Sequence, residues 1–213
     1  MSKYLNKELY LKVCNTNFKE VLQRKGYVYF EKGNYNLNII GVRAFVNDNK
    51  VTNIYDDLLI VEYKVNNNVN RQVIFPITTE PGLTSLNKLV NYKGCAILVP
   101  GQYRGCWKIG LHKGKYQALV QRKPVKVYRD KNLDDIYDLD AKTIEDGIFG
   151  INIHRSNENI TGYNVNNWSA GCQVFSDPND FNTFMRIVKN AEAIWGNSFT
   201  YTLIEEKDLN YDK

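Results

Sequence analysis

Short apolar segments separated by turn-forming residues constrain the fold of this chain more than any other feature. Between residues 27 and 79 they read VYF, NLNIIGVRAFV, LLIVEYKV and RQVIFPIT, with Gly- and Asn-containing breaks at residues 32–34 and 47–49. Short runs rich in β-branched and aromatic residues, bounded by such breaks, are typical of β-strands. The segments GCAILVP, YQALVQ and PVKVYR continue the pattern. The sequence therefore predicts a mainly β chain.

Two helices are predicted at the ends of this β-rich region. Asn17 is an N-cap for residues 18–25, and Gly26 follows as a helix end. Near the C-terminus, Asp177 precedes a proline, as at a helix start, and Gly196 ends the segment. Apolar residues recur between them at helical spacing: Phe181, Phe184, Met185, Val188, Ala191 and Trp195. A last strand, SFTYTLI, is expected after this helix.

The composition is that of a folded, mildly basic protein. Hydrophobic residues make up 43% of the 213 positions and charged residues 24%, which is too apolar for a disordered chain. The 28 Lys and Arg residues exceed the 23 Asp and Glu residues, and the net charge of +5 attracts anionic polymers weakly. The basic residues are scattered and form no stripe, so no nucleic-acid partner is expected.

The first residues, MSKYLNKELYLKV, lack the apolar run and small-residue cleavage site of a secretory signal. No stretch has the length of a membrane span. We therefore expect a protein synthesised in the cytoplasm without a signal peptide and without a membrane span.

The four cysteines, Cys14, Cys95, Cys106 and Cys172, form no CxxC pair, so neither a zinc ribbon nor a disulfide scaffold is indicated. Cys14 and Cys95 are expected to be buried as small hydrophobic residues, and the role of Cys106 stays open. Asp130, Asn132 and Asp134 are spaced like the start of a calcium loop, but the later glycine and glutamate are missing. The sequence predicts no metal and no cofactor.

The two histidines, His112 and His154, narrow the search for a catalytic group. His154 ends the strand-like run GIFGINIH, and Cys172 follows 18 residues later in NNWSAGC. If the intervening loop returns Cys172 beside His154, thiol and imidazole come within hydrogen-bonding range, and an imidazolium would lower the thiol pKa. Gly171 would allow a tight turn with exposed backbone N–H groups.

These residues resemble a known family. The segments IHRSN and WSAGC are similar to the His-gap-Ser-x-Gly-Cys signature of the L,D-transpeptidase (YkuD-like) catalytic domain. The resemblance covers residues 148–175 closely and residues 85–205 loosely. The segments NLNIIGVR, TTEPG, VPGQY, GLHKGKYQALVQ and VYRD ahead of the signature also resemble bacteriophage-encoded members.

The resemblance implies an α+β, mainly β fold: an L,D-transpeptidase-like β-sandwich with an N-terminal and a C-terminal helix. Residues 81–213 would form the catalytic domain, and residues 1–80 a helix and β-rich segment packed on that core as one compact unit.

It also implies acyl transfer on peptidoglycan stem peptides. Cys172 would be the nucleophile and His154 the general acid and base, its tautomer set by a backbone carbonyl. The N–H groups of Gly171 and Cys172 would hold the oxyanion. Ser169 would either polarise the site or form the turn.

Two positions depart from the family signature. Ala170 stands where a histidine is common, and Val174 where an arginine is common and would bind a substrate carboxylate. Arg155 or Arg104 could replace that arginine. His112, with Tyr103 and Trp107, could line the substrate groove or simply pack in a loop.

The sequence thus predicts a cysteine-dependent L,D-peptidase or L,D-transpeptidase that acts at the bacterial cell wall, with virion association as one route there. The alternative is a catalytically inactive virion or wall-binding protein that keeps the fold. Alkylation of Cys172 by iodoacetamide near about pH 6 would indicate a thiolate of low pKa.

Overall fold

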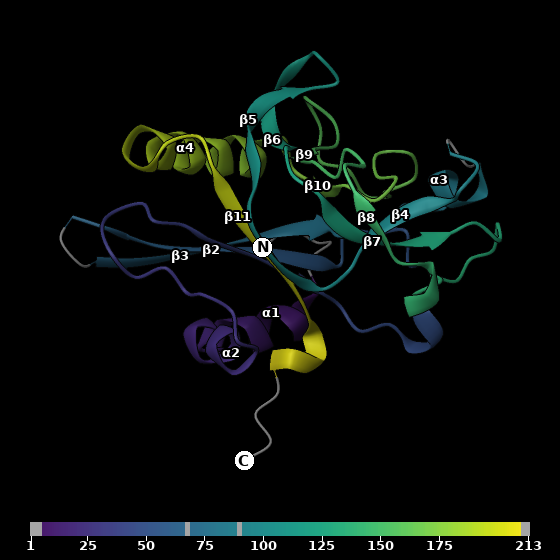
Figure 1. Cartoon of the computed structure of the whole chain (residues 1–213), viewed down its shortest axis with the longest axis horizontal. Helices are drawn as coiled ribbons and strands as arrows, with labels where there is room; N and C mark the ends of the chain where they lie inside the picture. Colours follow the sequence, from purple (N-terminus) through teal and green to yellow (C-terminus); the bar gives the residue numbers. More distant parts are fainter. Residues whose placement is uncertain (1–5, 67–68, 89–90, 210–213) are drawn as a thin grey trace.

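The β-rich segments form the wall of a closed barrel in the computed structural model of the chain, which describes residues 6–66, 69–88 and 91–209 (Figure 1). Within these residues the barrel strands, in order around the wall, are β1 (Asn38–Arg43), β11 (Phe199–Glu205), β5 (Gly101–His112), β6 (Tyr116–Gln121), β9 (Ile153–Arg155), β10 (Gln173–Phe175), β3 (Val69–Thr78) and β2 (Asp57–Val65). A smaller sheet beside the barrel contains β4 (Cys95–Leu98), β7 (Val125–Asp130) and β8 (Glu145–Gly147).

The expectation of a β-sandwich is wrong, although the protein is α+β with helices near both ends. Strand β1 pairs in parallel with β11, the last strand of the chain, and β3 pairs antiparallel with β10. These two pairings close the strands into one continuous barrel, whereas a sandwich has two separate sheets with free edges. Residues 38–78 therefore form part of the barrel wall, so strands from both sides of residue 80 share one barrel.

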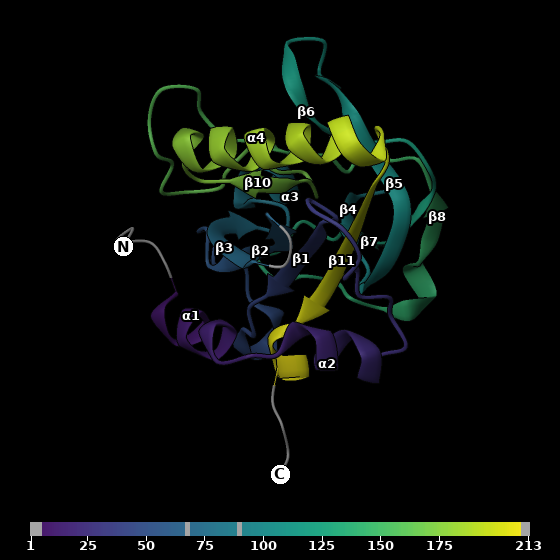
Figure 2. The same cartoon turned by 90° about the vertical axis from the view of Figure 1, so that its left-hand side faces the viewer.

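Helices cover the barrel on opposite sides (Figure 2). The helices α1 (Lys7–Cys14) and α2 (Phe18–Arg24) pack their apolar side chains against β1 and β2 from outside. The Asn17 side chain caps α2 by accepting from the N–H of Glu20, which confirms the N-terminal helix expected from the sequence; α1 was not expected.

The long helix α4 (Pro178–Trp195) confirms the C-terminal prediction, including the cap at Asp177 and the end at Gly196. Its inner face joins the main core, where Phe184 packs against the rings of Phe75 and Phe175. No helix among the described residues has the length and apolarity needed to cross a membrane.

Shorter helices complete the structure: α3 (Leu83–Asn87) and the 3₁₀ turns η1 (Asn47–Asn49), η2 (Ala141–Thr143) and η3 (Glu206–Leu209). The expected strand at residues 28–30 is not formed. Strand β5, by contrast, was not expected, because its residues GQYRGCWKIGLH do not alternate cleanly between apolar and polar.

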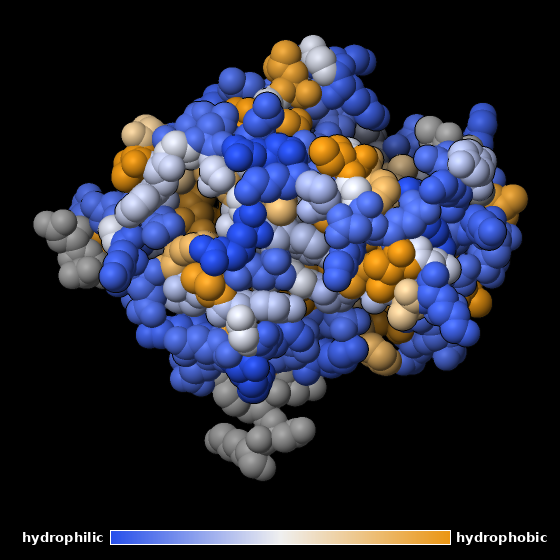
Figure 3. Space-filling model, in the orientation of Figure 1, coloured by the Kyte–Doolittle hydropathy of each residue, from blue (hydrophilic) through white to orange (hydrophobic). Residues whose placement is uncertain are grey.

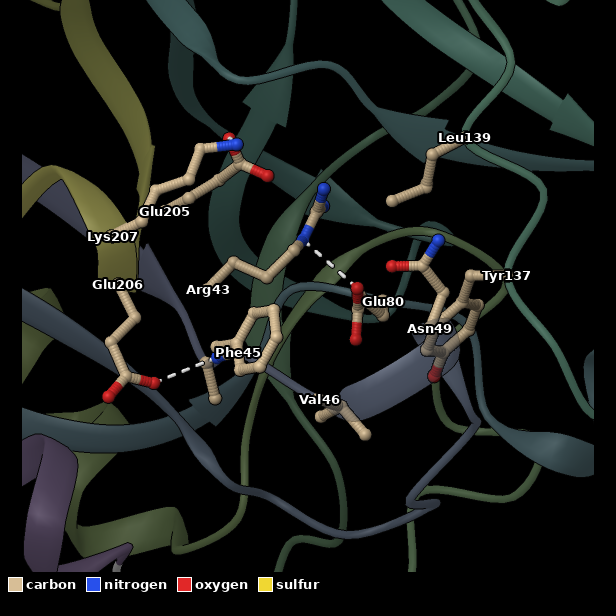
Figure 4. A pocket seen from close by; sticks show the side chains of 11 residues that line it. Arg43, Phe45, Val46, Asn49, Glu80, Tyr137, Leu139, Glu205, Glu206 and Lys207 are labelled. Carbon is tan, nitrogen blue, oxygen red and sulfur yellow. Dashed lines mark hydrogen bonds and ion pairs between the residues drawn. The ribbon is translucent and has the colours of Figure 1, made fainter.

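A buried polar network connects the barrel to the smaller sheet. The Arg43 guanidinium donates to the hydroxyl of Thr79 at 3.0 Å and to the carbonyl of Leu98, in β4, at 3.1 Å, and it pairs with Glu80 at 3.1 Å (Figure 4). The Asp57 carboxylate accepts from the N–H groups of Ala44 and Thr79, both at 2.7 Å. Buried charges need such partners, so this network ties the smaller sheet to the ends of β1 and β3.

The packing of α4 leads to a stability prediction. Phe184→Ala removes a ring that is fully buried, so we expect the free energy of unfolding to fall by about 3–5 kcal/mol. Ile194→Ala, on the same helix but 54% exposed, is the matched control and should change it by less than about 0.5 kcal/mol. Urea denaturation measures both values, and equal losses would contradict the placement of α4.

Candidate active site

The parallel pairing of β9 with β10 brings the two signature segments together. Val174 lies opposite His154 in this register, and the N–H of Gln173 donates to the carbonyl of Asn152 at 2.9 Å. Cys172 therefore lies beside Asn152. Because side chains alternate between the two faces of a sheet, Asn152 and His154 point to the same side, while Ile153 points into the barrel core.

Cys172, His154 and His112 line one cavity of about 750 Å³ outside the barrel. The main other side chains around it are Asn152, Phe149, Trp168, Lys88 and Lys113. The fold thus places the only sequence-expected nucleophile and both histidines at a single site.

The turn ahead of Cys172 is held by Ser169 and requires Gly171. The buried Ser169 hydroxyl accepts from the N–H of Gly171 at 3.1 Å and donates to the carbonyl of Cys172 at 2.9 Å. Gly171 has φ +120°, and a Cβ atom there would clash with the carbonyl oxygen of Ala96 in β4. Ser169 therefore forms the turn.

The expected oxyanion donor at Gly171 is not available, because its N–H is already bonded to Ser169. Of the expected pair, only the Cys172 N–H stays a candidate.

The Cys172 thiol is neutral at rest. It donates to the carbonyl of Gly150 at 3.3 Å and accepts from the N–H of Asn152 at 3.4 Å, so the hydrogen bond between thiol and imidazole expected from the sequence is not formed. Burial raises the thiol pKa above its ordinary value, against the weaker opposing effects of the Asn152 N–H and the Lys113 charge. The low-pKa thiolate expected from the sequence is therefore not supported.

His154 is oriented by a backbone carbonyl, as expected from the sequence. Its Nδ1 lies 2.7 Å from the carbonyl oxygen of Arg155. A carbonyl only accepts, so Nδ1 carries the proton and Nε2 has a free lone pair. The Tyr116 hydroxyl donates to the same carbonyl at 3.1 Å. Burial, followed by the nearby His112, lowers the pKa of His154 to about 3, so the ring is neutral at rest.

His112 lines the cavity, as the groove hypothesis expected. Its ring stacks on that of His154 with centroids 3.9 Å apart and an interplanar angle of 22°. The Asn152 side-chain nitrogen lies 3.0 Å from His112 Nδ1. Burial lowers the pKa of His112 to about 4, with a smaller effect from Lys113.

Three expected substrate-binding residues lie elsewhere. Trp107 is fully buried in the barrel, where its indole N–H donates to the carbonyl of Ile151, so it presents no face to a substrate. Tyr103 donates to the carbonyl of Val99 and packs edge-on against Trp107.

Arg155 points away from the cavity. Its guanidinium lies 3.9 Å from the centroid of the Tyr116 ring and pairs with Glu158 at 3.0 Å. Arg104 lines a different pocket, beside Trp195. Neither arginine takes the role that the resemblance gives to an arginine at position 174, and Val174 itself is buried against Tyr55 and Val165.

Sequence reasoning missed Asn152, Lys88 and Lys113. Asn152 could have been found, because it precedes His154 by two residues and so shares its face of a strand. Lys113 directly follows His112 at the turn of the β5–β6 hairpin, where it has φ +49°. Lys88, at the end of α3, carries no signal in the sequence.

Among the described residues, no group of three or more His, Cys, Asp or Glu side chains could hold a metal ion. No family model matches the chain, and no curated protein or solved structure matches it either. The site is therefore interpreted from its own geometry.

The raised thiol pKa predicts the pH dependence of alkylation. Cys172 should react slowly with iodoacetamide near about pH 6, and the rate should increase steadily through about pH 9, because thiolate forms only at the higher pH. Peptide mass spectrometry resolves Cys172 from Cys14, which is exposed rather than buried as expected from the sequence and serves as the internal control. A rate for Cys172 that already levels off near about pH 6 would contradict the neutral thiol.

The turn geometry predicts a stability difference between two glycines. Gly26→Ala, in open space at φ +71°, should cost about 1–2 kcal/mol from backbone strain alone. Gly171→Ala should cost about 1–3 kcal/mol more, because the methyl group meets the Ala96 carbonyl. Urea denaturation of both variants measures the difference, and equal costs would contradict the close approach of Gly171 to β4.

Proposed function

We propose that this protein is a cysteine-dependent acyl-transfer enzyme that acts on peptidoglycan stem peptides, as an L,D-peptidase or L,D-transpeptidase. The observation that carries the proposal is the position of Cys172 and an Nδ1-protonated His154 on one face of paired strands, in one cavity. The resemblance of IHRSN and WSAGC to the L,D-transpeptidase signature supplies the substrate class.

The geometry supports acyl transfer by general acid and base catalysis. His154 Nε2 accepts the thiol proton as Cys172 Sγ attacks a peptide carbonyl carbon and forms a tetrahedral oxyanion. When the C–N bond breaks, the His154 imidazolium returns that proton to the leaving amine, and a thioester stays on Cys172. Attack by water, deprotonated by His154, then releases an acid and restores the thiol. An amine in place of water yields a cross-link.

The neutral resting pair suits this route. Because the pKa of His154 is lowered to about 3, its Nε2 lone pair is present throughout the neutral range. The cysteine proton then leaves only as the C–S bond forms, inside a cavity partly closed by protein.

Two lysines supply the positive charge that the usual arginine would provide. Lys88 and Lys113 stand at the cavity, where an ammonium group can bind a stem-peptide carboxylate. Phe149 and Trp168 add apolar surface along the same cavity, suited to the aliphatic parts of a peptide. These four side chains take over the substrate-binding role expected of Arg155, Tyr103 and Trp107.

Hydrolysis is the preferred outcome, since cleavage of wall peptides serves a phage-type enzyme better than cross-linking. The proposed site of action is the bacterial cell wall, with delivery by host lysis or within a virion. A fold that only binds the wall is the competing function, and the following test separates the two.

Incubation with purified muropeptides tests the proposal. We expect new products by mass spectrometry with the wild-type protein and with Cys14→Ala, whose thiol is exposed and outside the site. Cys172→Ala should give none, because no other thiol lines the cavity among the described residues. Identical product profiles for wild type and Cys172→Ala would reject cleavage or cross-linking of peptidoglycan peptides and leave the wall-binding function.

A further inference from the structure

The oxyanion expected at Cys172 has fewer backbone donors than the sequence indicated. The N–H of Gly171 is bonded to Ser169, and the N–H of Asn152 points to the Cys172 sulfur. Only the Cys172 N–H stays available from the expected pair. Acyl-transfer sites commonly use two or more donors for this charge, so a side-chain donor in the cavity becomes relevant.

The hydrogen bonds of Asn152 determine which nitrogen of His112 carries its proton. Asn152 Oδ1 accepts from the backbone N–H of Gln121 at 3.0 Å, which assigns the oxygen end of the amide. The amide nitrogen then faces His112 Nδ1 at 3.0 Å and must donate to it. Since a neutral imidazole has one proton, that proton is on Nε2 of His112.

The two stacked rings consequently have opposite tautomers. His154 is protonated on Nδ1 and offers a lone pair at Nε2, whereas His112 accepts at Nδ1 and offers an N–H at Nε2. Both rings line the cavity of Cys172. One ring is suited to take a proton and the other to donate a hydrogen bond.

The surroundings of His112 keep it a neutral donor. His112 is only 6% exposed, and the positive charge of the neighbouring Lys113 disfavours protonation of its ring. A neutral imidazole can stabilise an oxyanion by hydrogen bonding without releasing its own proton. It also tolerates the positive charge that forms on the stacked His154 during attack.

We propose that His112 Nε2–H donates a hydrogen bond to the oxyanion that forms when Cys172 attacks the substrate carbonyl. This inference rests on the proposed acyl transfer and assigns His112, from the β5–β6 hairpin, a catalytic role. The hairpin stands at the top of the molecule in Figure 1, and an apolar cluster marks its tip in Figure 3.

Two reagents separate oxyanion stabilisation from thiol reactivity. Acylation of Cys172 by p-nitrophenyl acetate passes through an oxyanion, whereas alkylation by iodoacetamide does not. His112→Phe keeps a flat ring for stacking but has no donor, so its acylation rate should fall about 100-fold while its alkylation rate stays within about threefold. His112→Gln, which retains a side-chain N–H, should recover acylation to within about tenfold of wild type.

Two outcomes overturn the proposal: acylation by His112→Phe that stays near wild type, or acylation and alkylation that fall together. The activated ester needs no natural substrate, so a failure on muropeptides rejects the peptidoglycan assignment without affecting this test.

If His112→Phe does not fold, nitrogen-15 NMR of histidine-labelled wild-type protein decides the question. A proton on Nδ1 of His112 would reject the proposal, and a proton on Nε2 with His154 protonated on Nδ1 would support it.

Discussion

The parallel pairing of β9 with β10 is the interaction on which the site depends. The register of this pairing decides to which face of the sheet each side chain points. A shift by one residue would turn His154 into the barrel core and Ile153 toward the cavity. Each of these strands has three residues, so the pairing alone is weak. Strand β3 on one side and β6 on the other hold the pair within the closed barrel.

The smaller sheet supports the same site from outside the barrel. Gly171 lies against the carbonyl of Ala96 in β4, so the position of β4 limits the turn that presents Cys172. Arg43 connects β4 to the end of β3 through Leu98 and Thr79. The geometry of the thiol therefore depends on contacts with residues more than 70 positions away in the sequence.

Local signals in the sequence predicted the local elements well. Asn17 and Asp177 marked two helix starts, and Gly196 marked a helix end, because capping depends on neighbouring residues. The motif also singled out Cys172 and His154, and both line one cavity. Tyr103, Trp107 and Arg155 were assigned to the site by residue type, yet burial and local partners direct them elsewhere. Lys88 reaches the cavity through tertiary packing.

The sequence by itself determined the strand-rich character, the two capped helices and the signature cysteine and histidine, since all of these follow from residue type and short-range spacing. Only the tertiary structure decided that the sheet closes into a barrel, that Ser169 takes up the Gly171 N–H, and that His112 stacks on His154. The physical reason is that strand pairing, burial and tautomer choice depend on partners brought together by folding, and the spacing of residues along the chain does not specify those partners.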